Sequence, residues 1–119
     1  MLNNALFGIV EEAGYGAMTL GEYLERDELL ASRLTRAELR RQLLIMANAI
    51  GDVPAASRAL LAELEWDGWA HLRGALAPFQ DPARADEALR FGLRSLVPAT
   101  LIWLRVYRKN QPQLFAYTV

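Results

Sequence analysis

The sequence predicts an all-α protein, more specifically an antiparallel four-helix bundle with extra short helices. Apolar residues recur almost everywhere at the three- and four-residue spacing of an α-helix, and the loops between these segments are short. The chain has 119 residues, enough for one hydrophobic core, and shows no internal repeat or linker. We therefore expect a single domain over residues 1–119.

Two helices are expected in the N-terminal part of the chain. Apolar residues at helical spacing run from Leu2 to Ala13, and residues 14–16, Gly-Tyr-Gly, are expected to end that helix. Residues 19–22, Thr-Leu-Gly-Glu, have the form of a capping box, in which a threonine and a glutamate satisfy free backbone N–H groups at a helix start. A short helix is therefore predicted to begin there and to continue toward Leu30.

A second capping box, Thr-Arg-Ala-Glu at residues 35–38, begins the helix with the clearest signals. Its apolar stripe consists of Leu39, Leu43, Met46 and Ile50. Gly51 is expected to end this helix in the left-handed conformation that glycine adopts most readily.

The middle of the chain predicts two more helices. Residues 57–65 form a short one after Pro54. The next is expected to begin at Trp66, with Asp67 as its N-cap. Its apolar face should contain Trp69, Leu72, Leu76 and Phe79.

The C-terminal part predicts a long helical segment with a proline inside it. Asp81 and Pro82 combine an N-cap residue with a proline at the first helical position. Asp86 and Arg90 are spaced to form an ion pair along one helix face. The core stripe contains Ala85, Leu89, Leu93, Leu96 and Val97.

Pro98 lacks a backbone N–H group, so it is expected to kink or split the C-terminal segment. Residues 101–107 beyond it are apolar nearly all round, and Gln111 and Pro112 are expected to end the helix. A helix with apolar residues on several sides needs more than one neighbour. This need favours a homodimer, or a complex with another chain.

Composition and charge exclude several classes of function. The chain has no cysteine, which excludes structural disulfides and zinc sites built from thiolates. Its net charge is −1. No secretory signal is apparent, and the longest nearly apolar run, residues 96–104, is too short for a membrane span. We therefore expect a cytoplasmic protein with no membrane partner.

The charges are unevenly distributed, with residues 1–30 mainly acidic and residues 73–109 mainly basic. All but one of the 13 basic residues are arginine, a side chain suited to phosphate and carboxylate. The pattern fits phosphate binding, but it also fits pairing between helices or subunits, and GC-rich coding favours arginine as well.

No catalytic or metal-binding arrangement stands out. His71 is the only histidine, so a histidine cluster for a metal cannot form within one chain, and no cofactor motif is present. Asp67 and His71 are spaced i and i+4 on the predicted helix, which is compatible with an oriented imidazole and equally with an ordinary surface histidine.

Several segments between residues 39 and 97 follow the order and spacing of one known family. They are the apolar helix of residues 41–51, the start of the motif helix with Glu-Trp-Asp-Gly-Trp-Ala at residues 65–70, Asp81, and Leu-Val-Pro at residues 96–98. Together they resemble the HepT-like family of HEPN domains. Members of that family are dimeric helical ribonuclease toxins that work without metal. Their antitoxin partner is a small nucleotidyltransferase that adenylylates a tyrosine of the toxin.

The family's functional motif is an arginine, four further residues, a histidine, one residue and a tyrosine. Arg73 matches the arginine, whereas Pro78 and Gln80 occupy the histidine and tyrosine positions. Proline cannot transfer a proton, and the glutamine side chain has no phenolic oxygen to accept a nucleotidyl group. The resemblance therefore implies a degenerate motif in which Arg73 either holds a phosphate or forms an ordinary ion pair.

Three functions are compatible with this sequence. The first is a non-catalytic, dimeric HepT-like module that binds a partner protein such as the nucleotidyltransferase, or RNA, through Arg73, Arg84 and Arg90. The second is an active ribonuclease that uses Arg73, with His71 acting from a shifted position. The third is a helical scaffold or small-molecule sensor with no connection to RNA.

Overall fold

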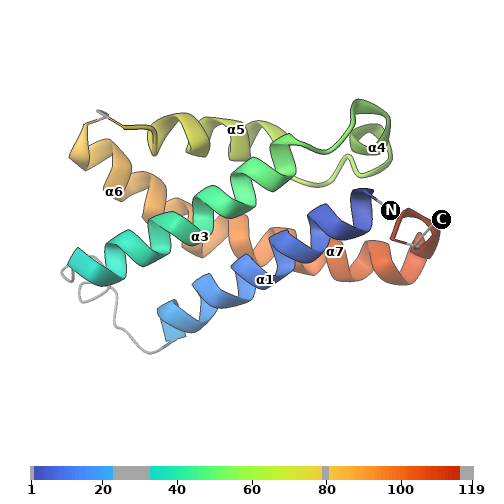
Figure 1. The fold of residues 1–119 in the computed structure, drawn as a ribbon, viewed down its shortest axis with the longest axis horizontal. Helices are drawn as coiled ribbons and strands as arrows, with labels where there is room; N and C mark the ends of the chain where they lie inside the picture. Colours follow the sequence, from blue (N-terminus) through green and yellow to red (C-terminus); the bar gives the residue numbers. More distant parts are fainter. Residues whose placement is uncertain (1, 23–32, 79–80, 116–119) are drawn as a thin grey trace.

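The computed structural model describes residues 2–22, 33–78 and 81–115, and all the regular secondary structure in these ranges is helical. The helices are α1 (Leu2–Glu22), α3 (Arg33–Gly51), α4 (Ala55–Leu60), α5 (Trp66–Ala75), α6 (Pro82–Phe91), the π-helical turn η1 (Gly92–Leu96), α7 (Val97–Asn110) and the 3₁₀ turn η2 (Pro112–Leu114). The all-α prediction is therefore confirmed (Figure 1).

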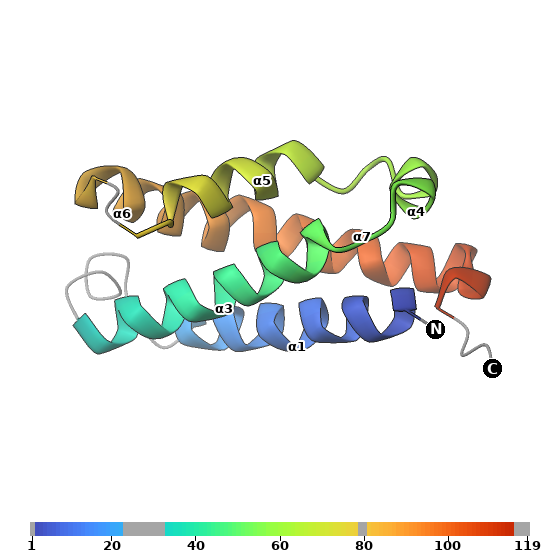
Figure 2. The same ribbon diagram turned by 45° about the horizontal axis from the view of Figure 1, so that its top comes forward.

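The two longest helices, α1 and α3, lie side by side and run in opposite directions (Figures 1 and 2). Helix α5 packs on α3, and α7 packs on α1, so the four segments enclose a shared core. The short helix α4 lies at the end of the molecule where α3 finishes and α5 begins. None of the helices within the described ranges is both long and apolar enough to span a bilayer.

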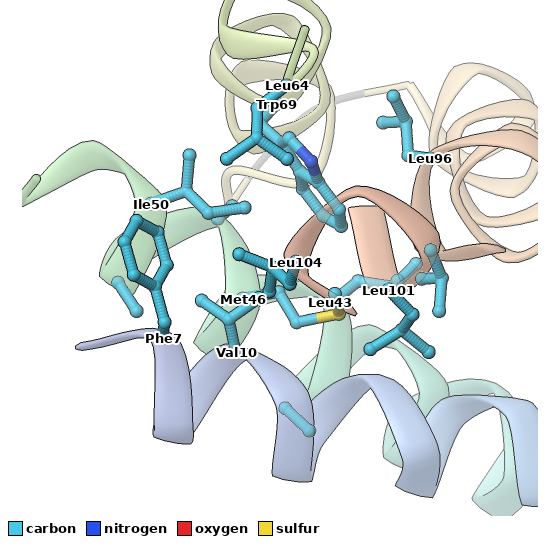
Figure 3. Close-up of a cluster of buried hydrophobic side chains, with 14 of the residues drawn as sticks. Phe7, Val10, Leu43, Met46, Ile50, Leu64, Trp69, Leu96, Leu101 and Leu104 are labelled. Atoms are coloured by element: carbon cyan, nitrogen blue, oxygen red, sulfur yellow. The ribbon is translucent and has the colours of Figure 1, made fainter. Parts of the chain in front are cut away.

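The predicted stripe of α3 forms the centre of the core. Leu39, Leu43, Met46 and Ile50 are all buried, as their three- and four-residue spacing predicted. Side chains from α1, α5, the π turn and α7 meet this stripe, and Figure 3 shows part of the cluster. Apolar burial of this extent is the main force that holds such helices together.

Helix α1 is longer than the sequence predicted. It passes through residues 14–16 without a break, because the side of α1 that carries Gly14 is packed against α3 and α7. A Cβ atom on Gly14 would lie 2.9 Å from a methyl carbon of Leu101 and 3.2 Å from the Met46 methyl carbon. The glycine therefore permits close helix packing, and the prediction of a break was wrong.

The predicted capping box at residues 19–22 is also wrong. Thr19 lies inside α1, where its hydroxyl donates to the carbonyl of Tyr15, one turn earlier, at 2.9 Å. The short helix predicted toward Leu30 falls mostly on residues 23–32, which lie outside the described residues.

Both predicted ends of α3 need correction. The helix includes Arg33, two residues before the predicted cap at Thr35, and the Glu38 carboxylate accepts hydrogen bonds from Arg41 and Gln42. Gly51 is the last helical residue, but its φ is not left-handed. The short helix predicted at residues 57–65 is α4, which begins and ends earlier, at Ala55 and Leu60.

The start of α6 is as predicted, since the Asp81 carboxylate accepts the backbone N–H of Ala83 at 3.0 Å and Pro82 is the first helical residue. The predicted pair of Asp86 with Arg90 is replaced by an ion pair with Arg36 of α3, at 3.5 Å. This pair links two helices instead of two turns of one helix.

The interruption predicted at Pro98 takes the form of a π turn that precedes the proline. The backbone N–H of Val97 donates to the carbonyl of Gly92, five residues earlier, as in a π-helix. Gly92 lies tightly between two helices, because a Cβ atom there would lie 2.8 Å from Leu72 and 2.9 Å from Leu43. Helix α7 then continues to Asn110, and Gln111 follows it as predicted.

Two polar contacts link α7 to other parts of the fold. Arg108 of α7 forms an ion pair with Glu11 of α1, which joins an acidic segment to a basic one. The Tyr107 hydroxyl donates to the Glu63 carboxylate and accepts the backbone N–H of Glu63, so α7 also holds the loop before α5. Burial and this carboxylate both raise the pKa of Tyr107, while the hydroxyl lowers the pKa of Glu63.

The packing of Gly14 leads to a prediction that compares two glycines of α1. Gly8→Ala should stabilise the protein by up to about 1 kcal/mol, because alanine favours helix and nothing lies within 4 Å of the new Cβ atom. Gly14→Ala has the same helix gain but crowds Leu101, so it should be about 1–3 kcal/mol less stable than Gly8→Ala. Urea unfolding of the two variants measures the difference, and equal stabilities would contradict this account.

The Tyr107–Glu63 contact leads to a pH prediction. Folding raises the pKa of Tyr107 above its usual value of about 10. The contact therefore contributes its full stabilisation to the folded state below about pH 10, and this stabilisation is lost as the pH rises through the folded pKa. The native chain should therefore lose stability above about pH 10 more steeply than Tyr107→Phe does. Unfolding at pH 7, 9 and 11 tests this, with Tyr15→Phe, at an exposed tyrosine, as the control.

Candidate functional site

Helix α5 carries Arg73, and a buried tryptophan one turn earlier positions it. The indole N–H of Trp69 donates to the Thr100 hydroxyl of α7 at 3.0 Å. Trp69 is only 1% exposed, and Figure 3 shows its ring within the buried apolar cluster. Arg73 follows Trp69 by four residues, so it lies at the edge of the buried face, beside α3. The fold thus places an exposed guanidinium along the α3–α5 seam.

Helix α5 begins at Trp66 as predicted, but its N-cap residue and its end differ from the prediction. Glu65, not Asp67, occupies the N-cap position, and its side chain forms no capping hydrogen bond. The helix ends at Ala75, so Pro78 lies in the turn that follows. Leu76 is buried as predicted, whereas Phe79 and Gln80 lie outside the described residues.

Two adjoining hollows lie along the seam between α3 and α5, and they share Ala70 and Arg73. One has a volume of about 440 Å³ and the other about 310 Å³. We call them together the arginine groove. The larger hollow is lined by Arg40, Leu44, Ala70, Arg73, Gly74, Leu76, Ala77 and Pro78. The smaller is lined by Ala47, Ile50, Gly51, Arg58, Trp66, Trp69, Ala70 and Arg73.

The groove forms because small side chains face each other across the seam. Ala47 and Gly51 of α3 lie opposite Ala70 of α5, and short side chains leave a space that larger ones would fill. Arg40 and Arg58 stand at the two ends of the groove, and Arg73 lies between the hollows. The groove therefore has a mainly apolar floor and three positively charged groups.

Arg58 completes the C-terminal end of α3. Its guanidinium donates to the carbonyl of Gly51 at 2.7 Å and to that of Val53 at 3.0 Å. Carbonyl oxygens at the end of a helix accept no backbone N–H group from a following turn, so they are open to another donor. The partial negative charge of a helix C-terminus also favours a cation there. The guanidinium also lies over the Trp66 ring, 5.3 Å from its centroid.

The other two arginines differ in how they are held. The Arg40 guanidinium donates to the carbonyl of Leu76, beyond the end of α5. Arg73 makes no hydrogen bond or ion pair with any residue that the structure describes, although its guanidinium lies within 3.5 Å of the position of a Cβ atom on Gly51. Arg73 is thus held near α3 and is free to bind an anion.

The structure brings together some of the predicted site residues but not all of them. Arg73 and Pro78, the first two positions of the degenerate motif, line the same hollow. His71 and Arg84 instead line a third hollow, of about 490 Å³, between α5 and α6, together with Glu87. Arg90 is exposed on α6 and lines none of these three hollows.

Sequence reasoning missed Arg40 and Arg58. Arg40 precedes Leu44, Ala47 and Gly51 by four, seven and eleven residues, so the helical period could have placed it on the same stripe. No such signal exists for Arg58, whose position depends on how the segment between α3 and α5 folds back.

The described residues that line the groove can bind anions, and none of them is a group that transfers protons near neutral pH. The only histidine lines the α5–α6 hollow, on the other flank of α5 from Arg73. Arginine remains protonated at neutral pH, so it supplies charge and hydrogen bonds instead of a general base. The described residues also contain no group of three or more metal-ligating side chains.

Comparison of the chain with protein-family models, with curated proteins and with solved structures finds no significant match.

The contacts of the arginines predict different effects on stability. Arg58→Ala removes two charged hydrogen bonds and a ring contact, so it should lower the free energy of unfolding by about 1–2 kcal/mol. Arg73→Ala removes no such contact and should change it by less than about 0.5 kcal/mol. Chemical denaturation measures both, and a large loss for Arg73→Ala would mean that Arg73 is a structural residue.

Proposed function

We propose that this chain is a degenerate HepT-like module that binds a partner protein or RNA without cleaving RNA. In this proposal the protein is cytoplasmic and α1, α3, α5 and the α6–α7 segment form an antiparallel four-helix bundle. The bundle pairs with a second copy so that two motifs face one cleft. A small nucleotidyltransferase is the partner that the sequence resemblance implies.

One observation carries the proposal: the motif positions Arg73 and Pro78 line one hollow, although α5 ends between them. The hollow therefore contains the motif arginine, which can bind an anion. At the position of the family's catalytic histidine it contains a proline instead. Positive charge without an acid–base group suits binding and not hydrolysis.

Exposed apolar side chains support association with another chain. Ile102 of α7 is 59% exposed and Phe91 of α6 is 52% exposed, although both belong to segments that otherwise pack into the core. Apolar groups left in solvent favour the homodimer or complex of this proposal.

The ribonuclease alternative receives less support. It would require His71 and Arg73 to act on one phosphate, but they line different hollows on the two flanks of α5. Residues two apart on a helix diverge by about 200°, so a single chain cannot aim both at one atom.

The decisive experiment is RNA cleavage by the purified protein and by Pro78→His/Gln80→Tyr, which restores the two missing motif groups. We expect no cleavage by the native chain, measurable cleavage by the double variant, and loss of that activity when Arg73→Ala is added. The added change is the matched control, because it leaves the new histidine and tyrosine in place.

Two results would contradict the proposal. Cleavage by the native chain that Arg73→Ala abolishes would make the protein an unconventional ribonuclease. No cleavage by any variant, with folding verified by circular dichroism, would count against a HepT-like scaffold.

A further inference from the structure

The arginine groove carries charge that nothing in the described part of the chain neutralises. Three other arginines pair with carboxylates: Arg36 with Asp86, Arg41 with Glu38 and Arg108 with Glu11. The arginines at the two ends of the groove instead donate to neutral carbonyl oxygens, and Arg73 forms no hydrogen bond or ion pair with any described residue. No aspartate or glutamate is among the described residues that line the groove.

The floor of the groove is apolar, which limits the kinds of anion that fit. Leu44 and Leu76 line the larger hollow, and Ile50 and Trp66 line the smaller one. A phosphodiester chain would cover this floor with charged oxygens and lose hydration without apolar contact. A ligand with apolar side chains between acidic ones would satisfy both the floor and the arginines.

The length of the groove matches a few turns of helix. Eleven residues separate Arg40 from Gly51 along α3, which corresponds to a rise of about 16 Å, or three turns. Ala70 lies midway and allows close approach, as small residues do where helices pack. A groove between two helices is a common docking place for a third, amphipathic helix.

We propose that the arginine groove docks an amphipathic helix of another protein, whose apolar face covers the floor and whose flanking carboxylates bind Arg40, Arg58 and Arg73. The apolar floor favours this partner over RNA, whose charged backbone would cover the floor without apolar contact. This inference rests on the proposed function only in taking the groove as a binding face.

The test uses the full chain and three probes in fluorescence-anisotropy titrations. The first is a synthetic peptide of about 15 residues, long enough for partial helix, with leucines on one face and glutamates on both flanks. The second is the same peptide with each glutamate changed to lysine, and the third is a single-stranded oligouridylate. Only the glutamate peptide is expected to bind, and added salt should weaken that binding.

Variants locate the binding. Arg73→Gln should weaken binding of the glutamate peptide about tenfold, because a charged hydrogen bond is lost. Ala70→Glu should weaken it at least as much, because it fills the groove with a side chain of the wrong charge. The matched controls are Arg94→Gln and Ala83→Glu, at exposed residues that do not line the groove, and these should change affinity by less than about twofold.

Several outcomes would overturn the inference. They are no binding of the glutamate peptide, equal binding of the lysine peptide, or equal weakening by the control variants. Oligouridylate binding that depends on Arg73, without peptide binding, would assign the groove to RNA.

This inference and the proposed function can fail separately. Cleavage restored by Pro78→His/Gln80→Tyr together with no peptide binding would support the HepT-like module and overturn the acidic helix. Groove-dependent peptide binding without restored cleavage would support the docking groove and leave the family assignment contradicted.

Discussion

The buried indole of Trp69 is the contact on which the arrangement of this protein most depends. It fills the space where α3, α5 and α7 meet, and its N–H group bonds to Thr100, the buried polar side chain among the described residues. An indole in an apolar core needs a hydrogen-bond partner, and only one rotation of α5 gives it this partner. That rotation turns Arg73 toward α3 and His71 toward α6.

Helix α5 separates Arg73 from His71, so the two side chains do not face one site within a single chain. An active site of the HepT-like kind needs an arginine and an imidazole on one phosphate, whereas here α5 divides them between two hollows. The arginine flank gains two more guanidinium groups, from Arg40 and Arg58, and no carboxylate from the described residues that line it. Binding of an acidic group by this flank is therefore a simpler use of the geometry than catalysis.

Glycine and proline show why local sequence signals mislead in a tightly packed helical protein. Gly14 looks like a helix breaker, yet it permits the close approach of α1 to α3 and α7. Gly51 looks like a left-handed cap, yet Arg58 satisfies that helix end. Pro98 interrupts the hydrogen-bond pattern as expected, but a π turn one turn earlier absorbs the disturbance. At Gly14, packing against neighbouring helices outweighs the preference of the isolated segment.

The sequence by itself determined the helical class, the buried stripe of α3, the cap at Asp81 and the end of α7, because these depend on periodicity and on residues close in the chain. It also predicted Arg73 as a candidate site residue. Only the tertiary structure decided which arginines share a groove, since Arg40, Arg58 and Arg73 come from three helices and meet through the packing of α5 on α3. It likewise paired Asp86 with Arg36 instead of Arg90. Helical period fixes which residues share a face, but the contacts between faces depend on how large and small side chains fit together.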